Sequence, residues 1–88
     1  MNLTYDIPDD GKEIDLIRWA LEDYTPICPL SMTLLNRIEN NRHIHFEDGV
    51  MIKKAIGYIL EKSDHQWVTY ILHVLPLLPL WLIPDLKP

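Results

Sequence analysis

The chain has 88 residues, of which 48% are hydrophobic and 24% are charged, and these values exclude an intrinsically disordered protein. The length allows one modest hydrophobic core. Folding of a chain of this size buries about 60–65% of the surface that the unfolded chain exposes. The net charge is −5, and more than half of the acidic residues precede residue 25, which disfavours a nucleic-acid partner. One cysteine, Cys28, excludes an intrachain disulfide. With no signal-peptide pattern either, we expect a cytoplasmic protein.

The first element in chain order is a short extended segment. Apolar and polar residues alternate over residues 2–7, a pattern typical of a strand laid on an apolar surface. We predict that it pairs with Leu80–Ile83 near the other end of the chain, which would bring both termini together.

A first helix is predicted over residues 11–24. Asp10 is the expected N-cap, with Glu13 three residues later in the capping-box position. The residue before Pro26 is biased away from helical angles, so the helix should end there. Trp19 lies off the apolar stripe, which makes it either a second contact surface or the lid of a wider core. The stripe itself consists of Ile14, Ile17, Leu21 and Tyr24, at helical spacing.

Two further helices are predicted in the middle of the chain. Ser31 is the expected cap of a helix over residues 32–41, and an acidic residue opens another over residues 49–62. Gly57 lies inside the latter helix and costs about 1 kcal/mol relative to Ala, which a close helix crossing would explain.

The last part of the chain is apolar throughout. The segment Trp67–Pro84 contains no Asp, Glu, Lys or Arg. Ser63 or Asp64 should cap a helix over residues 65–75, whose apolar residues on every side indicate a central or interfacial position. The prolines that follow predict an extended or polyproline II tail. They also argue against a membrane-spanning helix, because backbone groups would be left unsatisfied in lipid.

These elements predict an all-α fold. We expect a single helical domain over residues 1–88, built as a small bundle of about four short helices. Its extended N-terminal and C-terminal segments would form the minor two-stranded contact.

Two histidines are the only residues that resemble a metal site. His43 and His45 point the same way on an extended segment, next to two acidic residues. The remaining ligands are unspecified, however, and no CxxC or HExxH motif is present. An exposed polar face is the simpler interpretation, so we predict no metal and no cofactor. A His-ligated metal protein remains an alternative.

The sequence contains no catalytic motif, so we predict a non-enzymatic protein-protein interaction module of the inhibitor, adaptor or immunity type. Its partner is a protein, or a second copy in a homodimer. An alternative is a helix-turn-helix DNA-binding regulator built on the second and third helices, which their long acidic connection disfavours. The proposed contact surface combines an apolar C-terminal part with an acidic helix face. Its residues are Trp67, Tyr70, Leu80, Trp81, Leu82 and Ile83, with Trp19, Glu22 and Asp23 from the first helix.

Overall fold

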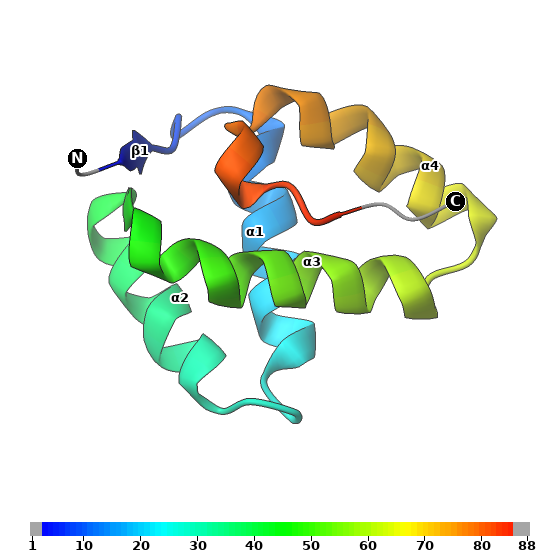
Figure 1. Cartoon of the computed structure of the whole chain (residues 1–88), viewed down its shortest axis with the longest axis horizontal. Coiled ribbons are helices and arrows are strands. Elements are labelled where there is room, and N and C mark those ends of the chain that lie inside the picture. The colour runs from blue at the N-terminus through cyan, green and yellow to red at the C-terminus, as the bar shows by residue number, and fades with distance from the viewer. Residues whose placement is uncertain (1–2, 86–88) are drawn as a thin grey trace.

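The computed structural model describes residues 3–85, so Asn2 of the predicted N-terminal strand lies outside it. Four helices dominate these residues, which confirms the all-α class (Figure 1). The helices are α1 (Lys12–Tyr24), α2 (Leu30–Asn41), α3 (Gly49–Lys62) and α4 (His65–Val74). The strands are β1 (Thr4–Asp6) and β2 (His43–His45), and short 3-10 turns cover Phe46–Asp48, Leu75–Leu77 and Leu80–Leu82. No helix within residues 3–85 is long and apolar enough to cross a membrane.

Helix α1 is the centre of the packing. It crosses behind α3 in Figure 1 and contacts α2, α3 and α4. Because it has neighbours on several sides, its buried face is wider than the predicted stripe and includes Leu16 and Ala20. Tyr24, the last residue of the stripe, is half-buried, and its ring lies 5.6 Å from that of Tyr58 on α3.

The predicted N-caps of α1 and α2 are wrong, whereas an acidic residue does precede α3 and α4: Asp48 is the N-cap residue of α3, without a side-chain hydrogen bond, and Asp64 caps α4. The N-cap of α1 is Gly11, without a side-chain hydrogen bond, rather than Asp10. Helix α2 begins at Leu30, because Pro29 fits the entry to a helix, and this places Ser31 inside the helix. In α4 the Asp64 carboxylate does accept a hydrogen bond from the backbone N–H of Trp67, at 3.3 Å.

Ser31 has a different function from the one that the sequence predicts. Its side chain is fully buried, and its hydroxyl donates to the backbone oxygen of Leu21 at 2.9 Å. The Thr25 hydroxyl lies 3.1 Å away and donates to the same oxygen. Ser31 therefore fastens the start of α2 to the end of α1.

The strand β1 pairs with β2 and not with Leu80–Ile83, so the predicted partner is wrong. The pairing is antiparallel, with Tyr5 opposite Ile44. Ile44 is fully buried, which fixes β2 on the core and leaves its free edge for β1. Residues Leu80–Leu82 form a 3-10 turn instead, and this turn packs on α3.

The C-terminal segment folds back on the helices rather than extending away (Figure 1). Two 3-10 turns replace the predicted polyproline conformation, and they bury Leu75, Leu78 and Leu82. These three leucines complete the core. Helix α4 is correspondingly not central, because it buries only Ile71 and Val74.

The close approach in this fold occurs at Gly49, not at Gly57. A Cβ on Gly57 would meet nothing within 4 Å, so the predicted helix crossing there is wrong. A Cβ on Gly49 would lie 3.0 Å from the ring of Trp81 and 3.2 Å from its backbone oxygen. Gly49 thus lets the C-terminal segment lie directly against the start of α3.

Arg42 ends α2 in a left-handed conformation, with φ of 57°. Its guanidinium donates to the backbone oxygens of Ile38 and Glu39, at 3.1 and 2.8 Å, so it caps the helix that it follows. Its Nε also lies 3.2 Å from a carboxylate oxygen of Asp9, an ion-pair contact that holds the N-terminal segment near α2.

We expect the substitution Arg42→Ala to lower the free energy of unfolding by about 1–2 kcal/mol, because the capping bonds are lost while the left-handed strain remains. Arg42→Gly loses the same bonds but relieves about 1 kcal/mol of strain, so its free energy of unfolding should be close to that of the wild type. Urea unfolding of the two variants measures the difference. An Ala variant as stable as the wild type would contradict the capping role, and equal stability of the Ala and Gly variants would contradict the left-handed strain.

Candidate functional site

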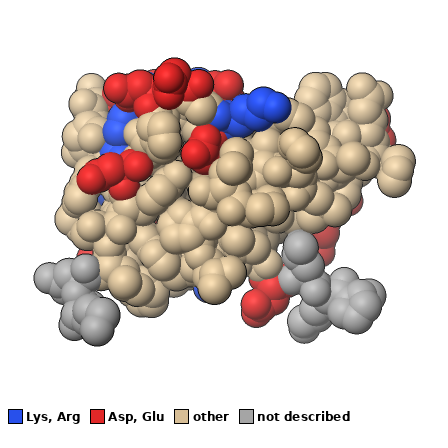
Figure 2. All heavy atoms as spheres, turned by 90° about the horizontal axis from the view of Figure 1, so that it is seen from above, with Lys and Arg blue, Asp and Glu red and all other residues tan. Residues whose placement is uncertain are grey.

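An uncharged face made by α4 and the C-terminal segment is the principal surface feature. Residues 65–84 contain no Asp, Glu, Lys or Arg. Figure 2 shows most charged side chains of this view gathered along one edge, beside a broad uncharged area. We use the name α4–tail face for the surface of α4 and of the C-terminal segment, which together expose four large apolar side chains. These are Trp67, Leu72, Leu77 and Leu80, the last of which is 86% exposed.

The α4–tail face contains a depression. A depression of about 610 Å³ is lined by seven residues, all of them leucine, isoleucine or proline. Leu72 of α4 and Leu80 of the C-terminal segment both line it, so the two elements form one continuous apolar surface. The lining residues are Leu72, Leu75, Pro76, Leu78, Pro79, Leu80 and Ile83.

The predicted contact residues of the C-terminal segment separate into different environments. Leu80 is exposed, and Ile83 is half-buried beside it. Leu82 is fully buried, so the hypothesis that it contacts a partner is wrong: the 3-10 turn directs it into the core. Trp81 is half-buried and packs on Phe46, with ring centroids 5.6 Å apart.

The remaining aromatic candidates meet where α1 and α4 touch. The rings of Trp19 and Trp67 have centroids 5.7 Å apart at 66°, and those of Trp67 and Tyr70 are 6.2 Å apart at 83°. With Asp15 they line an open hollow of about 490 Å³. We call these four residues the aromatic cage. Trp19 is half-buried and packs against the core cluster on one side, while its ring lines the open hollow on the other.

The walls of the aromatic cage are held in place by hydrogen bonds. The indole N–H of Trp19 donates to the Asp23 carboxylate at 3.0 Å, and Lys62 lies 3.3 Å from the same oxygen. Trp67 lies in the first turn of α4, where Asp64 caps its backbone N–H. Two of the three rings thus come from positions that are fixed by polar contacts on separate helices.

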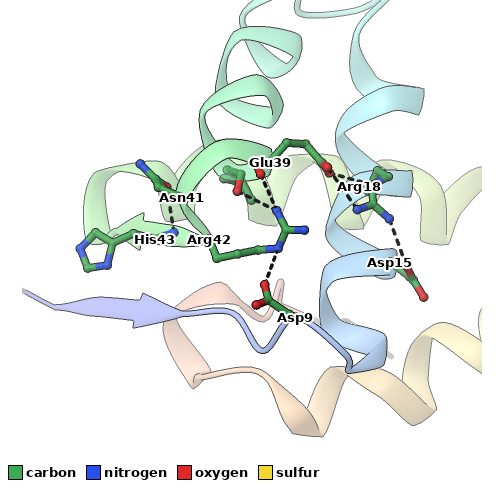
Figure 3. Close-up of polar contacts among 8 residues, drawn as sticks. Asp9, Asp15, Arg18, Glu39, Asn41, Arg42 and His43 are labelled. Atoms are coloured by element: carbon green, nitrogen blue, oxygen red, sulfur yellow. Dashed lines mark hydrogen bonds and ion pairs between the residues drawn. The ribbon is translucent and has the colours of Figure 1, made fainter.

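The outer side of α1 is acidic. Asp15 and Glu22 are exposed there, and Arg18 joins α1 to α2 by contacting Glu39 at 2.7 Å and Asp15 at 3.1 Å (Figure 3). The hydrogen bond from Arg18 lowers the pKa of the Glu39 carboxyl from its usual 4.5. A lowered pKa means that this pair stabilises the fold above pH 4.5, and that the contribution is lost as the pH falls through the lower value.

The two histidine candidates lie on β2, with their ring centroids 4.8 Å apart. His43 Nδ1 is 2.5 Å from an Asp6 oxygen across the strand pair, while His45 is exposed. Within residues 3–85, no group of three or more His, Cys, Asp or Glu side chains converges as a metal ion would need. His43 therefore has a structural partner in the strand pair.

The connection between α2 and α3 differs from that of a helix-turn-helix pair. Those motifs join their helices by a turn of about 3–4 residues, often with a glycine. Here the strand β2 and the 3-10 turn Phe46–Asp48 lie between the two helices. Asp48 holds this connection together, because it accepts from the backbone of His45 and pairs with Arg37 of α2.

The sequence did not single out Leu72, Leu77 or Asp15, although all three line or border the surfaces described above. Leu72 and Leu77 lie in a uniformly apolar segment, where nothing distinguishes an exposed leucine from a buried one. In the sequence, Asp15 has a simpler interpretation as a favourable negative charge near a helix N-terminus.

Comparisons with models of protein families, with curated proteins and with solved structures returned no match for this chain.

Proposed function

We propose that this chain is a non-enzymatic protein-binding module, and that the α4–tail face is its contact surface. The observation that supports the proposal most directly is that α4 and the C-terminal segment expose four large apolar side chains: Trp67, Leu72, Leu77 and Leu80. A few well-packed anchors, tryptophan and tyrosine foremost, contribute most of the affinity at protein interfaces, and surrounding apolar contacts exclude water from them.

The charges beside the face favour a protein of different sequence over a second copy. The acidic side of α1 adjoins the α4–tail face through the contact between Trp19 and Trp67. Two copies meeting there would bring acidic surfaces close together in a chain of net charge −5. We therefore infer a partner with an apolar patch that is flanked by Lys or Arg side chains, whose charge complements α1.

The experiment compares two exposed leucines. Leu80 lies on the α4–tail face, and Leu30, which is 66% exposed, lies at the start of α2 and serves as the matched control. The wild type, Leu80→Glu and Leu30→Glu are used to capture proteins from a lysate of the source cells. Any protein retained by the wild type is identified, purified and titrated against all three chains.

We expect Leu80→Glu to weaken binding of the purified partner by about ten-fold or more, because a charge is buried without a counter-ion, and Leu30→Glu to leave it unchanged. Equal binding by all three chains would overturn the proposal, as would the absence of any retained protein. Light scattering adds a further outcome: a wild-type dimer that Leu80→Glu converts to a monomer would identify a second copy as the occupant.

A further inference from the structure

The aromatic cage presents three rings that do not stack on one another. Trp67 lies between Trp19 and Tyr70 and is steeply inclined to both, at 66° and 83°. Steep angles leave ring surface uncovered toward the hollow that the three rings line. Trp67 is half exposed, so this hollow is accessible from solvent. The arrangement resembles neither a closed core cluster nor a flat stack.

The negative charge near the rings indicates the sign of the ligand. Asp15 lines the hollow, and its one ion-pair partner among the described residues is Arg18, which lies closer to Glu39 than to Asp15. The cation–π contact found within residues 3–85 is that of Lys62 over Tyr58, which is not a cage residue. Arg18 is therefore shared between two carboxylates, and the charges of Asp15, Arg18 and Glu39 together leave a net negative charge beside the three rings.

The shape of the aromatic cage discriminates between organic cations. A guanidinium is planar and is best bound by stacking on one ring and by a bidentate carboxylate. Asp15 already contacts Arg18, and the inclined rings line an open hollow rather than offering one plane. A primary ammonium is compact and strongly hydrated. A methylated ammonium is bulkier and has an apolar surface, so it can contact several ring faces at once.

We infer that the aromatic cage binds the methylated ammonium of a lysine side chain on a protein partner. This inference rests on the proposed function, because it specifies the chemistry that the partner presents beside the α4–tail face. The rings attract the cation through their π-electrons, Asp15 supplies the opposite charge, and the lysine stem lies toward the apolar face. No covalent step is involved.

The test uses short capped Gly/Ser peptides that differ only in the central side chain: trimethyllysine, lysine, arginine or norleucine. The three tryptophans provide internal reporters, since each indole N–H gives a separate signal in a nitrogen–proton NMR spectrum. We expect trimethyllysine to shift the signals of Trp19 and Trp67 and to leave that of Trp81 in place. It should bind about ten-fold more tightly than norleucine, and more tightly than lysine or arginine.

Two variants show whether the rings are responsible. Trp67→Leu should abolish the preference for trimethyllysine over norleucine, while Trp81→Phe, which changes a tryptophan outside the aromatic cage, should retain it. Tetramethylammonium is titrated in parallel, and affinity equal to that of the peptide would point to a free cation instead and overturn the lysine assignment. Equal binding of all four peptides, or no shift at Trp19 and Trp67, would also overturn it.

The outcomes separate this inference from the proposed function. Leu80→Glu leaves the four cage residues untouched, so it should bind the trimethyllysine peptide as the wild type does. If Leu80→Glu no longer captures the partner but still binds the peptide, the α4–tail face contacts the partner independently of the aromatic cage. Capture without peptide binding would refute the aromatic cage while leaving the proposed function in place.

Discussion

A chain that ends at Leu75 is expected to lose its cooperative unfolding transition and to be largely unfolded at room temperature. The deletion removes Leu78 and Leu82, which are 5% and 0% exposed, and uncovers the part of α3 on which the last 3-10 turn packs. Loss of one buried leucine side chain costs about 2–5 kcal/mol, and small domains are stable by only about 5–15 kcal/mol. Far-UV circular dichroism and light scattering of the shortened chain measure the result.

A milder form of the same experiment uses matched leucines two residues apart. Leu82→Ala should lower the free energy of unfolding by about 2–5 kcal/mol, whereas Leu80→Ala, at an exposed position, should change it by less than about 0.5 kcal/mol. A shortened chain that remains a folded monomer, together with equal effects of the two substitutions, would show that the C-terminal segment is not part of the core.

Alanine substitutions at two glycines of α3 are expected to change stability in opposite directions. At Gly49 the new methyl group would meet the ring and the backbone oxygen of Trp81 at 3.0 and 3.2 Å, so the C-terminal segment must shift. We expect a loss of about 1–3 kcal/mol, as for other overpacked sites. At Gly57 the methyl group meets nothing within 4 Å, and the helix gains about 0.5–1 kcal/mol from the better propensity of alanine.

Thermal and urea unfolding of Gly49→Ala and Gly57→Ala provide the comparison, with each variant serving as the control for the other. Neither glycine has a positive φ, so backbone strain does not enter the comparison. Stabilisation at both positions would show that the contact between Gly49 and Trp81 is loose. A loss of stability in Gly57→Ala would show that other atoms occupy the space beside Gly57 in solution.

Sequence reasoning succeeded where local signals decide the structure. The extent of α3 and the cap of α4 at Asp64 follow from apolar periodicity and capping chemistry, which involve only neighbouring residues. It failed for Ser31, because a serine before an apolar run has the same local pattern whether it caps a helix or is buried inside one. The deciding factor was Pro29, which starts α2 earlier.

Contacts between distant segments account for the other errors. Alternation identified residues 2–7 as extended, but a period of two does not specify the partner, and both β2 and the C-terminal segment were available. Gly57 was expected to permit a close approach that occurs at Gly49, since the position of Trp81 in space decides the matter. The aromatic cage has the same origin: Trp19 and Trp67 are far apart in sequence and meet only when α4 packs on α1.

The pairing of β1 with β2 has a consequence for the kinetics of this chain. Asp6 and His43 are 37 residues apart, and α1 and α2 both lie between them, so closing this loop before the helices dock carries a large entropic cost. Each strand is only three residues long, and an isolated strand pair of that size is marginal. We therefore expect the pair to form late during folding and to open early in the native state. Amide protons of β1 should then exchange with solvent through this local opening, whereas those of α1 should exchange only through global unfolding.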